Sequence, residues 1–410
     1  MVGARCAVPL REGKNVAVSQ KLKRHMTEGG WIRRMFEEGI TLKKKFGERN
    51  VFDLSLGNPV VEPPEKFRQE LRNWANNPKP GMHRYMPNAG YPETRAAVAA
   101  HLSSSTGLTF TANEIVMTCG AAGAINAVLK AISEPGDEII FFAPYFSEYI
   151  YYADNHQAIA RIVPTDNQFI PDLKALEQNI TPKTRAVLVN SPNNPTGVVY
   201  SHKTMHGMGK LLGKKERQYG TEIFLISDEV YRKLVYDGME CPYMFQYHPR
   251  TIVTTSHSKD LALPGERIGY IAVNPRYDGR EELINGLVFC NRVLGFVNAP
   301  ALMQHIVQSL QDASVDIEQY VRKRDFLYNN LTAMGYSIVK PRGAFYVFPK
   351  SPIEDDIAFV RELQKHNVLV VPGHGFGAPG YFRISYCVDD WVLEGSLKGF
   401  RAVSKEFGLH

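Results

Sequence analysis

Lys259 is the residue whose type and position most directly suggest chemistry. It follows a β-branched run over residues 251–255, which predicts a buried strand, and only three residues separate the two. A lysine just beyond a buried strand is partly desolvated, which lowers the pKa of its amine and makes that amine a nucleophile towards carbonyls. We therefore interpret Lys259 as a candidate covalent catalyst, with an ordinary surface lysine as the alternative.

Two neighbours of Lys259 suit a phosphate group. Ser256 lies three residues before it and offers a hydroxyl, and Arg267 lies eight residues after it, beyond a Pro-Gly turn, and offers a planar guanidinium. A lysine able to form a Schiff base beside a phosphate cradle is what pyridoxal phosphate requires of a protein.

The same arrangement, a predicted strand followed by a residue that could bind a ligand, recurs four times. The pairs are strand 114–118 with the small-residue turn 119–123, strand 138–142 with Phe146, strand 186–189 with Asn194, and strand 223–227 with Asp228. A small-residue turn that opens a helix favours a phosphate, because backbone N–H groups and the helix dipole both attract an anion. An aromatic ring can stack on a planar ligand, and an aspartate so close to a core is costly unless it is paired.

The alternation of strands and helices from residue 114 to residue 273 predicts an α/β fold with a parallel sheet flanked by helices. In such sheets the ligand site lies at the carboxyl ends of the strands, where all five candidate segments would meet. A smaller α/β unit follows a long helical pattern over residues 299–333. Its predicted elements are strands at 337–339, 344–348, 368–371 and 381–386 and helices at 355–366 and 390–407.

We divide the chain into three parts on this basis. Residues 1–60 are predicted to form an arm and helices that pack with the small domain, residues 61–298 the large ligand-binding domain, and residues 299–410 the small C-terminal domain. Residues 19–47 carry apolar residues at helical spacing, and Gly29-Gly30 interrupts the pattern, so we expect two helices or one broken helix.

Composition excludes several classes of protein. The net charge of +6 on 410 residues is small and dispersed, which argues against nucleic acid and membrane partners. Five widely spaced cysteines without a CxxC motif favour reduced thiols and a cytoplasmic location. No metal site is expected, because His202 and His206 have no third ligand nearby, and the GxGxxG match at 375–380 precedes a strand, so it lacks the helix of a dinucleotide site.

Taken together, the motifs resemble the class I/II aminotransferases, pyridoxal-phosphate-dependent enzymes of fold type I in the aspartate aminotransferase superfamily. The resemblance covers roughly residues 20–407. It rests on four segments that are specific in combination: Ser256-His-Ser-Lys259 with Arg267, Asn193-Asn194-Pro-Thr-Gly197, Asp228-Glu-Val-Tyr231 and Tyr381-Phe-Arg383-Ile-Ser.

The resemblance implies catalytic roles for three residues. Lys259 would hold pyridoxal phosphate as a Schiff base and then shuttle the proton between the substrate Cα and the cofactor. Asp228 would keep the pyridine nitrogen protonated, so that the ring can act as an electron sink. Tyr231, together with Asn194, would hydrogen-bond the phenolic oxygen of the ring.

The resemblance also implies the remaining contacts. Phe146 would stack on the ring. The phosphate would be bound by the amides of Ala121 and Ala122, by Ser256 and Arg267, and by Tyr85 of the neighbouring subunit in a homodimer with shared active sites. The substrate carboxylate would be held by Arg383, with Gly57 and Asn194 nearby. Relatives often have a longer side chain in the phosphate turn, whereas Ala121-Ala122 offers only backbone.

The function implied is transfer of an amino group between an L-amino acid and a 2-oxo acid. A β-elimination C–S lyase would share every residue named above and is the alternative within this chemistry. A non-catalytic binding or regulatory protein would be expected to have lost Lys259 or Asp228, and both are present. Arg292 is a candidate for the distal carboxylate of a dicarboxylic substrate, although a helix-surface arginine fits its spacing better.

Overall fold

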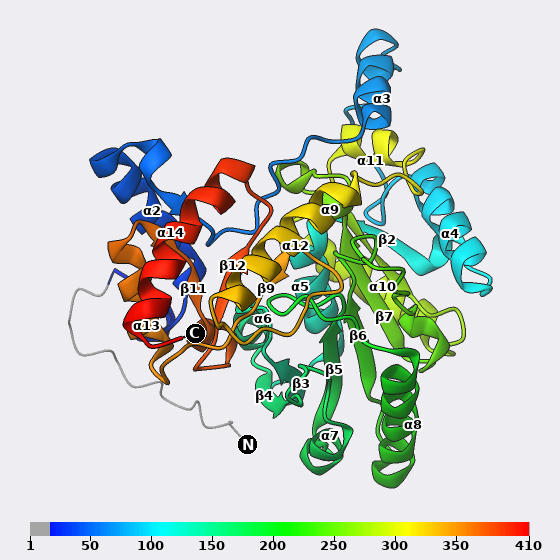
Figure 1. The fold of residues 1–410 in the computed structure, drawn as a ribbon. Helices are drawn as coiled ribbons and strands as arrows, with labels where there is room; N and C mark the ends of the chain where they lie inside the picture. Colours follow the sequence, from blue (N-terminus) through cyan, green and yellow to red (C-terminus); the bar gives the residue numbers. More distant parts are fainter. Residues whose placement is uncertain (1–16, 410) are drawn as a thin grey trace.

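A computed structural model describes residues 17–409 and consists of two α/β units, a larger one built around a seven-stranded sheet and a smaller one with two short sheets (Figure 1). The larger sheet has seven strands in the order β2-β8-β7-β6-β5-β3-β4. Their bounds are Ile115–Thr118 (β2), Glu138–Ala143 (β3), Ile159–Pro164 (β4), Thr184–Asn190 (β5), Phe224–Asp228 (β6), Thr251–Ser256 (β7) and Gly269–Val273 (β8). The predicted α/β fold with a mostly parallel large sheet is confirmed.

Alternating residues of the central strands pack into different cores. In β3, Ile139 and Phe141 belong to one apolar cluster, whereas Ile140 and Phe142 belong to another on the opposite face. Successive side chains of a strand point to opposite faces, so a continuous apolar run is expected for a sheet covered on both sides.

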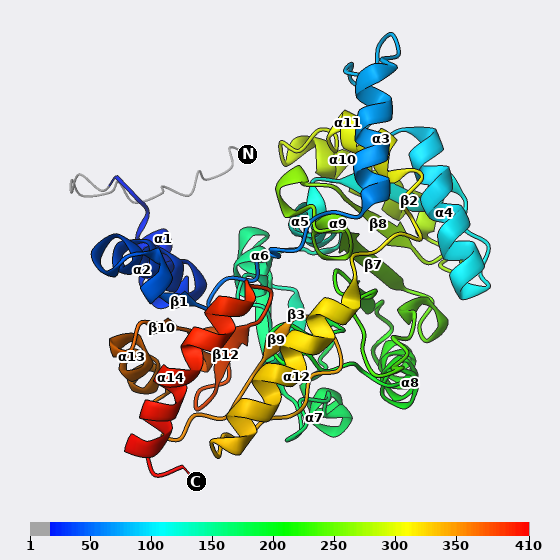
Figure 2. The same ribbon diagram turned by 45° about the horizontal axis from the view of Figure 1, so that its top comes forward.

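Helices cover both faces of the large sheet. The apolar cluster that contains Ile139 and Phe141 includes residues of α5 (Gly120–Ile132), α6 (Tyr149–Asn155) and α10 (Arg280–Val293). The cluster on the other face, which contains Ile140 and Phe142, includes residues of α7 (Leu173–Asn179) and α8 (His202–Tyr219). A third cluster joins α3 (Glu65–Asn76), α4 (Pro92–Thr106) and α11 (Ala301–Val307) to the β2 edge. In both views, α3 extends away from the body of the chain (Figures 1 and 2).

One strand of the large sheet runs against the others. β8 pairs antiparallel with both β7 and β2, whereas β3, β4, β5, β6 and β7 pair in parallel. The strand predicted at residues 268–273 is therefore present, and it is the antiparallel member of the mostly parallel sheet that was predicted. The Pro-Gly turn supplies the reason, because a short connection between neighbouring strands reverses the chain.

The small unit contains two short sheets. β1 (Phe52–Asp53) pairs in parallel with β10 (Val368–Leu369), and β12 (Phe382–Ser385) lies between β11 (Val371–Pro372) and β9 (Tyr346–Val347) in an antiparallel sheet. Its helices are α2 (Trp31–Phe46), α12 (Ile317–Ala333), α13 (Asp356–Lys365) and α14 (Asp390–Glu406), with α12 and α14 side by side (Figure 2). The residues 337–339 form no strand, because they lie in an extended segment without a ladder partner.

The N-terminal segment and the helix pattern over residues 299–333 are each split. α1 (Gln20–Glu28) ends at Gly29, and α2 begins after Gly30, whose φ of 79° suits a glycine, as the sequence predicted. The pattern over 299–333 forms α11 and α12, separated by residues 308–316. The domain boundaries at residues 60 and 298 stay predictions, although the packing of α11 on α3 and α4 favours grouping residues 301–307 with the large sheet.

An ion pair between a buried arginine and an exposed aspartate connects the two units. Arg324 of α12 is fully buried and makes two 2.8 Å hydrogen bonds to the carboxylate of Asp237, which follows β6. Backbone bonds from Arg342 and Gly343 to the carbonyl of Gly197 lie close by. The small unit is therefore fixed to the loops that follow the large sheet's strands.

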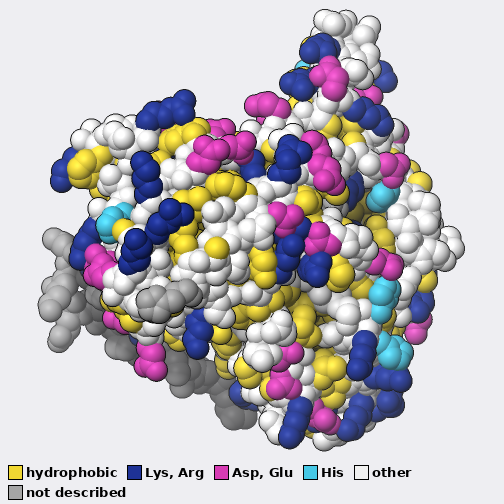
Figure 3. Space-filling model, in the orientation of Figure 1, with side chains coloured by type: hydrophobic (Ala, Val, Ile, Leu, Met, Phe, Trp, Pro, Cys, Tyr) yellow, Lys and Arg dark blue, Asp and Glu magenta, His cyan; other side chains and the backbone are white. Residues whose placement is uncertain are grey.

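Side chains of both charge signs are interspersed on the face seen in Figure 3, with Lys and Arg gathering over α8. Between residues 17 and 409, the structure has no helix with the length and apolar character needed to cross a bilayer.

Candidate active site

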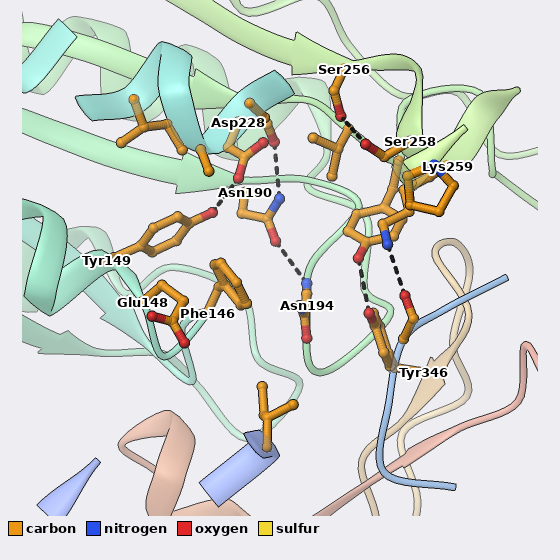
Figure 4. Close-up of a pocket in the computed structure, with 18 of the residues that line it drawn as sticks. Phe146, Glu148, Tyr149, Asn190, Asn194, Asp228, Ser256, Ser258, Lys259 and Tyr346 are labelled. Carbon is orange, nitrogen blue, oxygen red and sulfur yellow. Dashed lines mark hydrogen bonds between the residues drawn. The ribbon is translucent and has the colours of Figure 1, made fainter. Parts of the chain in front are cut away.

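A cavity of about 320 Å³ lies where the carboxyl ends of the large sheet's strands face the small unit. Figure 4 shows part of its lining. The residues predicted to bind the cofactor and the substrate α-carboxylate line it, with the exception of Tyr85. They are Gly57, Ala121, Ala122, Phe146, Asn194, Asp228, Tyr231, Ser256, Lys259, Arg267 and Arg383. The structure thus brings together residues that are up to 326 positions apart in the sequence.

The register of the strands explains this convergence. Asn190 at the end of β5 is the Cα partner of Asp228 at the end of β6, which is in turn the partner of Thr254 in β7. The segments that follow β2, β3, β5, β6 and β7 therefore leave the sheet at one edge. Because β8 runs in the opposite direction, Arg267 reaches the same edge by preceding its strand.

Lys259 lies on α9 (His257–Asp260), directly after β7. Its Nζ donates a 2.8 Å hydrogen bond to the carbonyl of Gly57 and lies 5.4 Å from the ring centre of Phe345. Burial lowers the pKa of Lys259 to about 8, and the positive charges of Arg383 and Arg267 act in the same direction. The amine is consequently neutral in an appreciable fraction of molecules near neutral pH, as a nucleophile must be.

Asp228 has one bonded and one unbonded carboxylate oxygen. The carboxylate is 5% exposed, and its Oδ2 accepts a 2.6 Å hydrogen bond from the hydroxyl of Tyr149. Its Oδ1 is buried and has no hydrogen-bond partner among residues 17–409. Burial raises the pKa of Asp228 to about 6, against the opposing effect of the bond from Tyr149. A buried acceptor without a partner marks a place where a donor from a ligand would fit.

Replacement of Asp228 by asparagine is expected to stabilise the cofactor-free protein. The pKa of Asp228 is about 6 in the folded protein and 3.8 ordinarily. The stability that this carboxyl group contributes is therefore fully present below pH 3.8 and is lost as the pH rises through 6. At pH 7 the neutral amide should raise the free energy of unfolding by at most about 3 kcal/mol. Urea unfolding of both proteins between pH 4 and 8 measures this difference, and a variant that is less stable at pH 7 would contradict it.

The start of α5 forms a cradle suited to a phosphate. Gly120 has a φ of 71°, and a Cβ on it would lie 2.9 Å from the guanidinium of Arg267, so only glycine lets the two approach. The first amides of α5 have no intrahelical acceptor. Ser256 and Ser258, whose hydroxyls are 3.1 Å apart, also line the cavity. Three kinds of donor therefore surround this end of it: backbone amides, serine hydroxyls and a guanidinium.

Arg383 lies in the central strand of the small sheet and is 1% exposed. Its guanidinium donates to Asn194 Oδ1 at 3.0 Å and to the carbonyl of Ser55 at 2.6 Å, while its Nε has no partner within the described chain. The rings of Tyr346 and Phe376 lie 4.6 and 4.8 Å from it. Arg383 is therefore buried within the small unit and is not exposed at a sheet edge.

Tyr231 and Tyr346 join the two units inside the cavity. Their hydroxyl oxygens are 3.0 Å apart, and burial raises the pKa of both well above the ordinary value, so both are neutral donors. Asn194 is held in place because its backbone N–H donates a 2.7 Å hydrogen bond to Asn190 Oδ1. The side of the cavity near Asn194 therefore presents hydroxyl and amide groups in fixed directions.

Two predicted residues lie outside this cavity. Tyr85 is 90% exposed, so its predicted contact with a neighbouring subunit stays a prediction. Arg292 is exposed on α10, with its guanidinium 5.3 Å from the ring of Phe289, which agrees with the helix-surface interpretation.

Sequence reasoning missed several lining residues: Glu148, Tyr149, Tyr152, Asn190, Ser258 and Tyr346. Tyr149 belongs to the aromatic segment after strand 138–142, but nothing local distinguishes it from Phe146 as the partner of Asp228. Asn190 directly follows the predicted strand 186–189, as Asp228 directly follows the predicted strand 223–227, and this shared position could have identified it. No sequence pattern identified Tyr346, because its position in the cavity depends on how the small unit packs against the large one.

Comparisons with known proteins agree on one family. The family described as aminotransferase class I and II matches residues 49–397. Aspartate/prephenate aminotransferase of Thermus thermophilus is 32% identical over 365 residues, which cover 85% of this chain and 90% of that protein.

Two solved structures are similar over almost their whole length. An amino transferase from Eubacterium rectale has a TM-score of 0.92 and 38% identity, over 96% of this chain and all of that chain. Aspartate aminotransferase from Thermus thermophilus with maleate has a TM-score of 0.84 and 29% identity, over 95% of this chain and all of that chain.

Proposed function

This chain belongs to the class I and II aminotransferases, and from that premise we propose that it transfers an amino group between an L-amino acid and a 2-oxo acid with pyridoxal phosphate bound in the cavity described above. The observation that carries this proposal is the presence, in one cavity, of an amine with a pKa of about 8 and a buried carboxylate oxygen without a partner. The aminotransferase relatives give no support to the β-elimination alternative.

The residues present fit this cofactor. A protonated ring nitrogen would give Asp228 Oδ1 the donor that the described chain does not provide. The α5 amides, Ser256, Ser258 and Arg267 would hold its phosphate, and Phe146 would cover its ring. When bound, pyridoxal phosphate supplies an aldehyde that reacts with amines and a ring that accepts electron density from the substrate Cα.

Each catalytic side chain has a separate task. Nζ of Lys259 is the attachment point and the base that removes the proton from the substrate Cα, because its lowered pKa leaves it able to accept one. Asp228, oriented by Tyr149, would keep the ring nitrogen of the bound cofactor protonated. Tyr231 and Asn194 would hydrogen-bond the phenolic oxygen of the ring when the cofactor is bound.

Arg383 binds the substrate carboxylate. A guanidinium with an unpartnered Nε between two aromatic rings can form a planar pair with a carboxylate, and its present bond to Asn194 keeps it pointed into the cavity. The side chain at Gly57 is limited to hydrogen, since a Cβ there would lie 2.0 Å from the hydroxyl of Tyr346. The homodimer with Tyr85 at a neighbouring site and the cytoplasmic location stay predictions.

Two measurements test the proposal. After incubation with pyridoxal phosphate, the protein should absorb visible light, and borohydride should fix the cofactor to the peptide that contains Lys259. A set of L-amino acids with 2-oxoglutarate should then yield glutamate. A colourless protein without label at Lys259 would overturn cofactor binding, and release of pyruvate and ammonia from one substrate would indicate a lyase.

A further inference from the structure

The cavity contains one charged group that neither the cofactor nor the substrate carboxylate would use. Glu148 immediately precedes α6, lines the cavity and is half-buried. Figure 4 shows it beside Phe146, on the side of the cavity away from Lys259 and Tyr346. It therefore lies towards the region that would take the far end of a substrate held by Arg383.

All three cations of the cavity lining have other partners or tasks. Lys259 bonds to Gly57, Arg267 packs against Gly120 at the phosphate cradle, and Arg383 bonds to Ser55 and Asn194. No other lysine or arginine of the described chain lines the cavity. A second carboxylate on the substrate would thus meet no free positive charge from this subunit's residues 17–409.

The carboxylate of Glu148 is itself without a partner. Between residues 17 and 409, it takes part in no side-chain hydrogen bond or ion pair, and burial raises the pKa of Glu148 without a cation to oppose the effect. A half-buried carboxylate that is not paired costs folding free energy, and such groups in a cavity are candidates for ligand contacts.

The surroundings of Glu148 suit an aliphatic chain that ends in a positive charge. Phe146, Ile32 of α2 and Tyr152 of α6 also line the cavity and give it apolar surface. Figure 4 places Phe146 beside Glu148, and Tyr152 lies close enough for the charge of Glu148 to raise the pKa of its hydroxyl. Methylene groups gain from contact with such surface, while an ammonium or guanidinium head would pair with the carboxylate.

We propose that Glu148 selects amino-acid substrates whose side chains end in an ammonium or guanidinium group, and that it disfavours dicarboxylates. The selection rests on the proposed function, since it takes Arg383 as the anchor for the substrate carboxylate. Glu148 acts in this scheme as a specificity-determining residue, with no part in proton transfer.

A pair of six-carbon probes isolates the charge at the far end of the substrate. 6-Aminohexanoate and adipate share one terminal carboxylate for Arg383 and differ at the other end, which is an ammonium in the first and a carboxylate in the second. Binding is measured by calorimetry to protein loaded with pyridoxal phosphate and then reduced with borohydride, so that the probe's amine cannot exchange with Lys259. We expect 6-aminohexanoate to bind at least about tenfold more tightly than adipate.

Variants at position 148 test the residue itself. Glu148→Gln keeps the size and removes the charge, and it should shrink the affinity ratio of the two probes by roughly 10- to 100-fold. Glu394→Gln, the same change at an exposed position of α14, is the matched control and should leave the ratio as in the parent protein.

The outcomes distinguish failure of the proposed selectivity from failure of the proposed cofactor binding. Adipate binding as tightly as 6-aminohexanoate in the parent protein would overturn the selection, as would an unchanged ratio in a folded Glu148→Gln variant. Should that variant fail to fold, the ratio in the parent protein decides alone. Failure of cofactor binding would appear earlier, as the lack of borohydride label at Lys259, and would concern the proposed function instead.

Discussion

Replacement of Lys259 by alanine should lower turnover by at least about 10³-fold, because this one amine is both the proposed attachment point of the cofactor and the base for the substrate Cα. The fold should persist. The Lys259 side chain makes a single hydrogen bond, to the carbonyl of Gly57, and its desolvation opposes folding. The variant should also retain non-covalent cofactor binding, since the phosphate cradle and Asp228 are untouched.

The measurement combines steady-state transamination, thermal unfolding and borohydride labelling. Lys210→Ala, at an exposed position of α8, makes the same chemical change far from the cavity and should behave like the parent protein. Full activity of Lys259→Ala would refute the assignment. If Lys259→Ala lost activity and its thermal unfolding curve showed no folded state, the loss of activity would be attributed to misfolding.

Replacement of Arg383 by alanine is expected to lower kcat/KM by roughly 10²- to 10⁴-fold and to raise KM, because a bidentate clamp on the substrate carboxylate is lost. Ser55 and Asn194 would also lose a donor, so a drop of about 1–3 kcal/mol in the free energy of unfolding is expected as well. Steady-state kinetics and urea unfolding measure the two effects separately.

Arg383→Lys serves as the comparison for this prediction. It keeps the positive charge but cannot form the planar two-bond pair, so its kcat/KM should fall between those of the parent and the alanine variant. An alanine variant that lost stability but kept the parent's KM would show that Arg383 is structural and would remove it from the substrate site.

Local sequence patterns determined the framework of this protein. The apolar runs and their alternation predicted six of the seven strands of the large sheet, because burial on both faces leaves a direct trace in the residue types. The edge strand β4 was missed, because most of its residues are exposed or only partly buried and it carries no such trace. The same pattern located Lys259, Asp228 and Asn194, since a polar residue within a few positions of the end of a buried strand is visible without knowledge of the rest of the fold.

The hydrogen-bond partners of the site residues could not be predicted in this way. Tyr149 bonds to Asp228 across 79 residues, and Lys259 bonds to Gly57 across 202. Several tyrosines and glycines would have served equally well by type, and only the packing of the chain selects among them. Tyr346 enters the cavity from β9 for the same reason, because the position of the small sheet is set by contacts such as Arg324 with Asp237.

The direction of β8 and the isolation of Glu148 were likewise decided by the tertiary structure. β8 reverses the chain beside β7, which brings Arg267 to the sheet edge from the opposite side. In the sequence Glu148 resembles an ordinary surface glutamate, and its significance arises because the part of the chain that the structure describes brings no cation to it. Sequence alone can name which residues carry charge, whereas their pairing depends on distances that only the folded chain sets.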